Sequence, residues 1–301
     1  MPVTAGDGRG ARGGTAVDRG MEATIAEQVG SAREARWIVE RAEGDAGVAR
    51  ALASRRGSGE PLQYVLGRWP FRTLDLAVDR RVLIPRPETE QVVEVALGEL
   101  ASLAADGAVP PGHPERPGPV AVDLGTGSGA IALSLAVEGG ARVPGLVVWA
   151  TDVSSDALTA AAENLEELAR HRPDAAGRVR LAEGRWFRAL PPELAGSVDL
   201  VVSNPPYVAE ADFPGLDPTV RLWEPRDALV ALDSDGVGGL ADIETVIVDS
   251  ARWLRPGGVV VVEIDPAQAD GALGAARRAG LVDGRTDVDL SGRVRMVVAR
   301  R

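Results

Sequence analysis

The order of apolar and polar positions divides the chain into a helical start and a long alternating part. Between residues 21 and 58, Ile25, Val29 and Ile38 stand at helical spacing in a charged, Ala-rich stretch. This spacing predicts a small module of two or three short helices over 21–58. Residues 1–20 are rich in Gly, Ala and Arg without any periodicity, which predicts a disordered lead.

Residues 59–84 follow a different pattern: Tyr64, Val65 and Leu66 precede Gly67, and apolar side chains follow at near-alternating spacing from Trp69 to Val78. Alternation of this kind predicts a β-hairpin and linker over 59–84. The two prolines of Ile84-Pro85-Arg86-Pro87 then predict a rigid turn, because each fixes φ and removes a donor. We expect Thr89 to cap the helix that follows, which runs to about Leu103.

Residues 85–301 form the large domain of the prediction, in which short apolar runs alternate with amphipathic segments from residue 119 onward. Strands are expected at 119–124, 147–152, 178–182, 198–203 and 258–264. Helices are expected at 129–138, 155–170, 240–254 and 267–279. The last two runs, 281–289 and 293–300, predict a hairpin. The fold class is therefore α/β, with a mostly parallel sheet covered on both faces and an antiparallel C-terminal strand.

Charge and composition narrow the classes of function. The net charge is −11 and every basic residue is Arg, so general electrostatics disfavour nucleic acid as a partner, and no DNA is expected. The chain has no cysteine and two histidines, which excludes disulfides and thiolate zinc sites, and we expect no metal. It has no run of eighteen apolar residues and no apolar signal region near the start. We therefore expect no membrane association and a cytoplasmic protein.

A glycine-rich loop follows the first strand of the alternating part. Glycines let the backbone turn sharply and approach a ligand, and ligands of open α/β sheets bind at the carboxyl ends of the strands. Dinucleotide enzymes space these glycines as Gly-x-Gly-x-x-Gly. The Gly-x-Gly-x-Gly spacing after an acid favours S-adenosylmethionine instead, and a tight turn without a ligand is the alternative. The candidate cofactor-binding residues are Asp123, Gly125, Thr126, Gly127, Ser128 and Gly129.

Two further residues are candidates for the same cofactor. Asp152 ends the second strand, where a carboxylate can accept both ribose hydroxyls. Its alternative role is to cap the helix that starts near Ser155. Trp186 follows the third strand and can lie on the adenine face, or else pack into the core.

The tetrapeptide Asn204-Pro205-Pro206-Tyr207 ends the fourth strand and carries the chemistry. A planar NH2 nitrogen is a poor nucleophile, so it must be held with its lone pair aimed at the methyl carbon. The Asn204 oxygen can accept one N–H and the Pro205 carbonyl the other, which also favours the positive charge that develops. Tyr207 can pack over the planar group. The catalytic residues are then Asn204, Pro205 and Tyr207, with Pro206 beside them in the substrate site. The alternative is a rigid proline turn with a capping Asn.

Together these motifs make the chain resemble the bacterial protein-(glutamine-N5) methyltransferases that modify class 1 peptide chain release factors. The resemblance covers roughly residues 25–300 and includes the Gly125–Gly129 loop, the Asn204–Tyr207 motif and the segment Leu83-Ile84-Pro85-Arg86-Pro87-Glu88-Thr89-Glu90. It also includes Pro61 to Gly67, Trp223-Glu224-Pro225-Arg226 and Asp289-Leu290-Ser291-Gly292-Arg293. The chain departs from the family pattern at Arg185, where an acid is commoner, and at Glu263-Ile264-Asp265, which lacks the usual glycine.

The resemblance implies a class I, Rossmann-like methyltransferase fold with a small N-terminal helical domain that recognises substrate. It implies S-adenosyl-L-methionine as cofactor, with S-adenosyl-L-homocysteine as product. Cofactor contacts would come from Gly125 to Gly129, Asp152, Trp186 and Asn204, and glutamine contacts from Asn204 to Tyr207. The acceptor would be the glutamine of the Gly-Gly-Gln motif of the release factor. A ribosomal-protein glutamine is one alternative acceptor, and adenine N6 of a nucleic acid is another.

Overall fold

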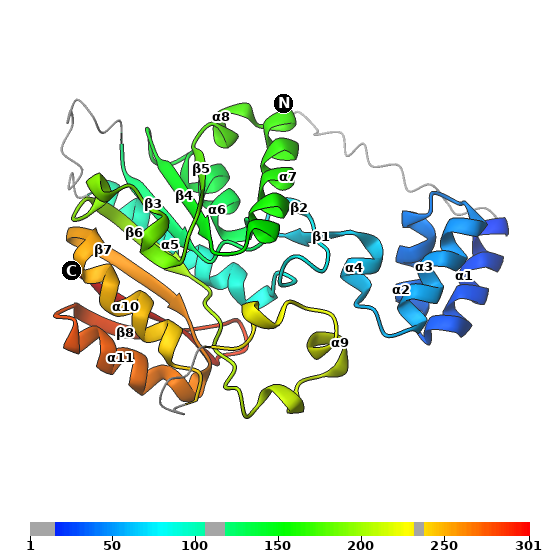
Figure 1. Ribbon diagram of the computed structural model, residues 1–301. Coiled ribbons are helices and arrows are strands. Elements are labelled where there is room, and N and C mark those ends of the chain that lie inside the picture. Colours follow the sequence, from blue (N-terminus) through cyan, green and yellow to red (C-terminus); the bar gives the residue numbers. More distant parts are fainter. Residues whose placement is uncertain (1–15, 106–117, 232–237) are drawn as a thin grey trace, which may run out of the picture. The chain divides into compact units, whose positions relative to one another are not determined.

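The computed structural model describes residues 16–105, 118–231 and 238–301 (Figure 1). The chain divides between Leu66 and Gly67 into two compact units. Most of the predicted lead lies outside the described residues. Helix α1 (Ala16–Val29) begins inside the predicted lead, so that prediction was wrong for residues 16–20. A helix that is already nucleated gains one hydrogen bond for each residue added, which allows it to extend beyond its packed part.

The described part of the first unit, residues 16–66, holds four helices: α1, α2 (Ala32–Arg41), α3 (Ala46–Gly57) and α4 (Leu62–Leu66). Ser31 and Asp45 start α2 and α3, because each side chain accepts backbone N–H groups of the first turn. Small and branched apolar residues fill the core between the helices, which consists of Ile25, Ala35, Ile38, Val39, Ala42, Ala49, Ala53 and Leu62. The unit therefore has a hydrophobic core of its own.

Helix α4 replaces the first part of the extended segment predicted over 59–84. The Val65 N–H donates to the Pro61 carbonyl at 3.0 Å, which is a helical bond, and Arg55 donates to the Tyr64 carbonyl at 3.0 Å. Leu62, Tyr64 and Val65 are buried. Periodicity cannot separate a short apolar helix from a strand, and packing decided for the helix. The predicted hairpin is present further on, as antiparallel strands β1 (Arg68–Phe71) and β2 (Leu74–Ala77).

The second unit is built on a seven-stranded sheet in the order β5-β4-β3-β6-β7-β9-β8. The first five positions hold parallel strands: β3 (Val120–Leu124), β4 (Val147–Asp152), β5 (Val179–Glu183), β6 (Val198–Ser203) and β7 (Leu254–Glu263). Strand β9 (Val294–Arg300) is antiparallel to β7 and to β8 (Val282–Val288). The predicted parallel sheet with an antiparallel C-terminal strand is confirmed.

The direction of chain travel distributes the helices over the two faces (Figure 1). From β3 the chain moves outward through β4 to β5, with α6 (Ala130–Ser134) and α7 (Ser155–His171) as crossovers. It then returns to β6 and moves the other way, with α10 (Ala241–Trp253) and α11 (Ala269–Arg278). Because such crossovers are right-handed, the two pairs of helices cover opposite faces. The reversal lies between β3 and β6, which is where open sheets bind ligands.

Helix α5 (Pro87–Ala105) packs against β6 and β7 and begins two residues before the predicted cap. Thr89 is therefore in its first turn, and its side chain makes a different contact, described below. The helix expected at 129–138 is α6 continued by a π-helical turn, Leu135–Gly139. The remaining short helical turns are α8 (Pro173–Ala176), η2 (Trp186–Ala189), η3 (Pro192–Leu194), η4 (Phe213–Gly215), α9 (Pro218–Arg221), η5 (Arg226–Ala228) and η6 (Pro266–Gln268).

A search of the described residues for a helix with the length and apolar character of a membrane span found none.

Candidate active site

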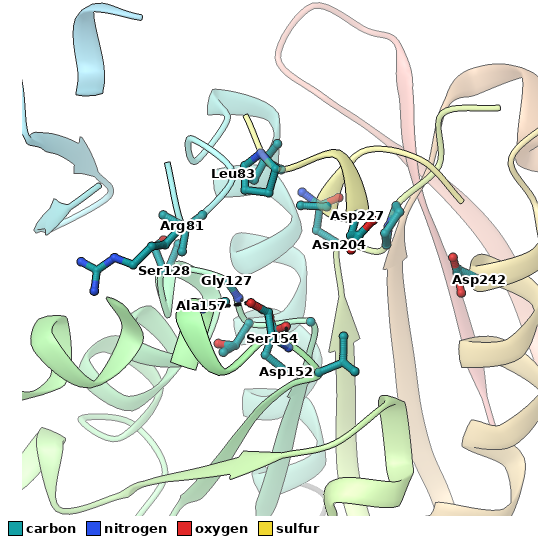
Figure 2. A pocket seen from close by; sticks show the side chains of 18 of the residues that line it. Arg81, Leu83, Gly127, Ser128, Asp152, Ser154, Ala157, Asn204, Asp227 and Asp242 are labelled. Atoms are coloured by element: carbon teal, nitrogen blue, oxygen red, sulfur yellow. Dashed lines mark hydrogen bonds between the residues drawn. The ribbon is translucent and has the colours of Figure 1, made fainter. Parts of the chain in front are cut away.

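A cavity of about 710 Å³ opens at the carboxyl ends of β3 and β6, at the point where the sheet reverses. Its lining includes the glycine loop after β3, residues at and beyond the ends of β4 and β5, and the segment after β6. Residues between Arg81 and Thr89 and Asp242 of helix α10 also line it. Figure 2 shows Gly127, Asp152 and Ser154 together on one side, and Asn204 with Asp227 at another. The cavity therefore joins the predicted cofactor loop to the predicted chemical motif.

The glycine loop adopts a backbone that favours glycine. Gly125, Gly127 and Gly129 have φ values of 74°, 55° and 84°. The N–H groups of Gly125 and Thr126 both donate to the Thr151 carbonyl at 2.9 Å, which ties the loop to β4. A Cβ on Gly129 would lie 3.2 Å from the Leu133 side chain. The loop is thus held close to the cavity wall, with Gly125, Thr126, Gly127 and Ser128 in the lining.

Asp123 lies beneath the loop and is fully buried. Its Oδ2 accepts the Thr126 hydroxyl at 2.6 Å and the Ala132 N–H at 3.1 Å, so it joins the loop to helix α6. Burial raises the pKa of Asp123 to about 7. It is not among the residues that line the cavity, and the same holds for Gly129. Asp123 and Gly129 therefore hold the glycine loop in place and do not form part of the cavity wall.

Asp152 lines the cavity and does not cap helix α7, because Ser154 is the capping residue and accepts the Ala157 N–H at 3.2 Å. The Asp152 carboxylate accepts the Gly127 N–H and the Ser154 N–H, each at 2.9 Å. Burial raises its pKa above the ordinary value. A carboxylate oxygen has two lone pairs, so both oxygens keep acceptor capacity toward the cavity.

Trp186 packs into the core, which was one of the two roles expected for it, and contact with adenine stays a prediction. The ring packs against the core of the sheet and also lines the cavity, close to Gly125. Trp186 has a φ of 49°, an uncommon backbone for a large residue, which points to a local constraint. Its indole Nε1 is buried and has no hydrogen-bond partner among the described residues. The neighbouring Arg185 pairs with Asp242 at 2.7 Å, and both line the cavity.

The Asn204–Tyr207 motif begins directly after Ser203, the last paired residue of β6. Asn204 and Pro206 line the cavity, whereas Pro205 is buried and Tyr207 packs half-buried against the core. The Tyr207 carbonyl accepts the Gln268 amide at 2.9 Å. Burial raises the pKa of Tyr207 to about 12, so its hydroxyl stays protonated at neutral pH. Two of the four residues are therefore in the cavity wall, and Pro205 and Tyr207 are not among the lining residues.

Several residues of this region were not candidates in the sequence. Glu224 accepts the Ile84 N–H at 3.0 Å and pairs with Arg86 at 2.5 Å, which fixes the Pro85-Pro87 turn beside the cavity. Thr89 accepts the Asn204 amide at 3.2 Å and donates to Glu263 at 2.7 Å. A buried acid at a strand end, such as Glu263, was the available signal. Its partner lies 174 residues away, so no local pattern could identify it.

The solved structures place the architecture among known folds. The N-terminal domain of human METTL16 in complex with SAH aligns with a TM-score of 0.51 at 17% identity, covering 81% of each chain. The family model "Methyltransferase small domain" matches residues 114–216. The order of the strands in the sheet, the cavity at the carboxyl ends of β3 and β6, and the match to this family model define a class I methyltransferase.

The curated relatives narrow the class. The "Release factor glutamine methyltransferase" of Bifidobacterium longum is 41% identical over 85% of this chain and 81% of its own length. The protein of the same name from Gloeobacter violaceus is 41% identical over 79% of this chain and 73% of its own length. The chain belongs to the release factor glutamine methyltransferase family.

Proposed function

We propose that this chain transfers a methyl group from S-adenosylmethionine to the side-chain N5 of the glutamine in the Gly-Gly-Gln motif of class 1 peptide chain release factors. The observation that carries the proposal is the meeting of two motifs in one cavity. The glycine loop after β3 and Asn204 after β6 line the same space, although they are far apart in the sequence. Membership of the family supports the choice of acceptor.

The residues around the cavity fit S-adenosylmethionine. The glycine loop allows a ligand to approach the backbone, Asp152 offers carboxylate oxygens to ribose hydroxyls, and the Trp186 ring offers an apolar face. The unpartnered Trp186 Nε1 is a donor that a ligand atom could use. When bound, S-adenosylmethionine supplies an electrophilic methyl group and leaves as S-adenosylhomocysteine.

The protein's own task is to hold the glutamine amide. In this proposal the Asn204 Oδ1 accepts one N–H of the substrate amide and the Pro205 carbonyl accepts the other. Pro205 lies beyond the paired part of β6, so its carbonyl is not required by the sheet. The two acceptors orient the nitrogen and favour the positive charge that develops on it. The surplus proton becomes acidic after transfer and passes to solvent, so no strong base is needed.

We also propose that the helical unit up to Leu66 recognises the release factor, as the family resemblance implies for the module predicted over 21–58. Its core is separate from that of the sheet, so it can present a surface without carrying the chemistry. The full release factor should then be methylated with a much higher kcat/KM than a short Gly-Gly-Gln peptide. Equal values for the two substrates would contradict this assignment.

The direct test uses S-adenosylmethionine with a labelled methyl group. The protein is incubated separately with purified release factor, with a release factor whose Gly-Gly-Gln glutamine is substituted, with ribosomes and with duplex DNA. Label is expected on the first substrate alone. Label on ribosomes would indicate the ribosomal-protein acceptor, and label on DNA alone would refute glutamine as acceptor.

A further inference from the structure

Three polar side chains form a hydrogen-bonded line that runs from the cavity wall into the core. The Asn204 Nδ2 donates to the Thr89 Oγ1 at 3.2 Å, and the Thr89 hydroxyl donates to the Glu263 Oε2 at 2.7 Å. Thr89 and Glu263 are buried, with 4% and 2% of their surfaces exposed. Asn204 and Thr89 both line the cavity, whereas Glu263 does not. Thr89 lies in helix α5, Asn204 directly follows β6, and Glu263 is the last residue of β7.

When Glu263 is ionised, the donors and acceptors of the three side chains can pair in only one way. An ionised carboxylate can only accept, so Thr89 must direct its single hydroxyl hydrogen at Glu263. The Thr89 oxygen can then only accept from Asn204, which forces the NH2 end of the Asn204 amide toward Thr89. The other end of the amide, Oδ1, consequently faces away from Thr89. A carboxylate at Glu263 thus determines which atom Asn204 can offer to a substrate.

We propose that Thr89 is a positioning residue that, backed by Glu263, holds the Asn204 amide with its oxygen toward the substrate nitrogen. This inference rests on the proposed function, since it concerns the acceptor amide. If the Asn204 amide were turned over, its NH2 would face the NH2 of the substrate glutamine. Two donors would then oppose each other, and the nitrogen would lose one of the acceptors that aim its lone pair.

The charged groups around Glu263 make this arrangement sensitive to pH. Burial raises the pKa of Glu263 to about 7, the Thr89 hydrogen bond opposes that rise, and Glu88 adds to it. Arg295 and Arg86 act in the opposite direction, and the Tyr207 hydroxyl is the other titratable neighbour. Once protonated, Glu263 can donate to Thr89, and the Thr89 hydroxyl is then free to donate to Asn204. The amide orientation is no longer forced below neutral pH.

The first test compares Thr89→Val with Thr89→Ser in the full chain. Valine keeps the shape without the hydroxyl, and we expect kcat to fall about tenfold or more, the equivalent of one lost hydrogen bond. The KM for release factor and the affinity for S-adenosylhomocysteine should stay within about twofold of wild type. Serine restores the hydroxyl and should restore kcat. Equal kcat values for Thr89→Val and wild type would overturn the inference.

The second test follows kcat against pH in wild type and Glu263→Gln. In wild type kcat should decline as pH falls through about 7, because Glu263 takes up a proton. Glutamine cannot titrate, so this inflection should disappear in Glu263→Gln. An unchanged inflection in the variant would contradict the role of Glu263. This comparison also decides the matter if Thr89→Val does not fold.

A third readout needs no substrate and separates this inference from the proposed function. The side-chain amide signals of Asn204, identified by their absence in Asn204→Ala, are followed by NMR against pH. They should shift with a midpoint near 7 in wild type and lose this shift in Thr89→Val and Glu263→Gln. If wild type shows the shift but does not methylate release factor, the proposed function fails while the oriented amide stands. Asn204 signals that are insensitive to both substitutions would refute the hydrogen-bonded line.

Discussion

At the scale of single residues, the site separates groups that contact the cavity from groups that hold them. Asn204, Asp152 and Trp186 line the cavity. Asp123 lies beneath the glycine loop and joins it to helix α6 through Thr126 and Ala132. The two aspartates therefore have different positions, and burial distinguishes them. Asp123 is completely buried beneath the loop, whereas Asp152 is partly exposed and lines the cavity.

Replacing Asn204 with Ala should abolish methyl transfer while cofactor binding persists. The substitution removes one of the two acceptors proposed for the substrate amide, and loss of a comparable oriented group in other enzymes lowers kcat by about 10²–10³. Steady-state kinetics with release factor would measure the loss, and calorimetry with S-adenosylhomocysteine would show whether the cavity is intact. Unchanged turnover would refute the role assigned to Asn204.

Asp123 should make the stability of the protein depend on pH. Its folded pKa of about 7 lies above the ordinary value of an aspartate, so folding favours the protonated form. The contribution is therefore fully present at acidic pH and is lost as pH rises from about 4 to about 7. Denaturant unfolding at several pH values should show this decline. The decline should be smaller in Asp123→Asn, because the amide does not titrate; identical pH dependence in both proteins would argue against it.

At the scale of elements, hydrogen bonds from two other parts of the chain fix the loop after β6. Its exit pairs with a distant segment, since the Val208 N–H donates to the Leu229 carbonyl and the Ala231 N–H to the Val208 carbonyl. Gln268 donates to the carbonyls of Tyr207 and Gly238, at 2.9 and 2.7 Å, and so links η6 to this loop. The position of the Asn204–Tyr207 motif is thus set by contacts outside the motif itself.

Two adjacent glycines give a matched test of this packing. A Cβ on Gly239 would lie 2.0 Å from the Tyr207 carbonyl oxygen, whereas a Cβ on Gly238 would meet nothing within 4 Å. Both have positive φ, 73° and 43°, so both alanine variants carry backbone strain. Gly238→Ala should cost about 1–2 kcal/mol of stability from strain alone. Gly239→Ala should cost more and should also lower kcat, because the Tyr207 backbone must move.

Thermal unfolding and turnover of the two variants would provide the comparison. Equal losses of kcat in Gly238→Ala and Gly239→Ala would show that the contact with Tyr207 does not position the motif.

At the scale of the whole molecule, the two units have separate cores, one between helices α1 to α4 and one on the sheet. Among the residues that the structure describes, those that line the cavity all belong to the second unit, from Arg81 to Asp242. A ligand that binds in the cavity therefore stabilises the folded state of the second unit directly.

Hydrogen exchange with S-adenosylhomocysteine should show this division. At about 100 times Kd the ligand stabilises the state that binds it by about 2.7 kcal/mol. Amides of the glycine loop and of β3, β4 and β6 should become more protected, whereas those of α2 and α3 should keep their rates. Equal protection in both units would show that they unfold together.

The sequence by itself determined the α/β sheet, the glycine loop and the Asn204–Tyr207 motif, because each depends on local periodicity and adjacent residue types. The same local rules misassigned residues 62–66, where packing of Leu62 and Val65 selected a helix over a strand. They also assigned Thr89 to a cap. Only the tertiary structure placed Thr89 between Asn204 and Glu263, and Asp123 under the loop rather than at the cavity. Hydrogen bonds between residues more than a hundred positions apart decided the role of Thr89, and burial decided that of Asp123. No pattern along the chain encodes either.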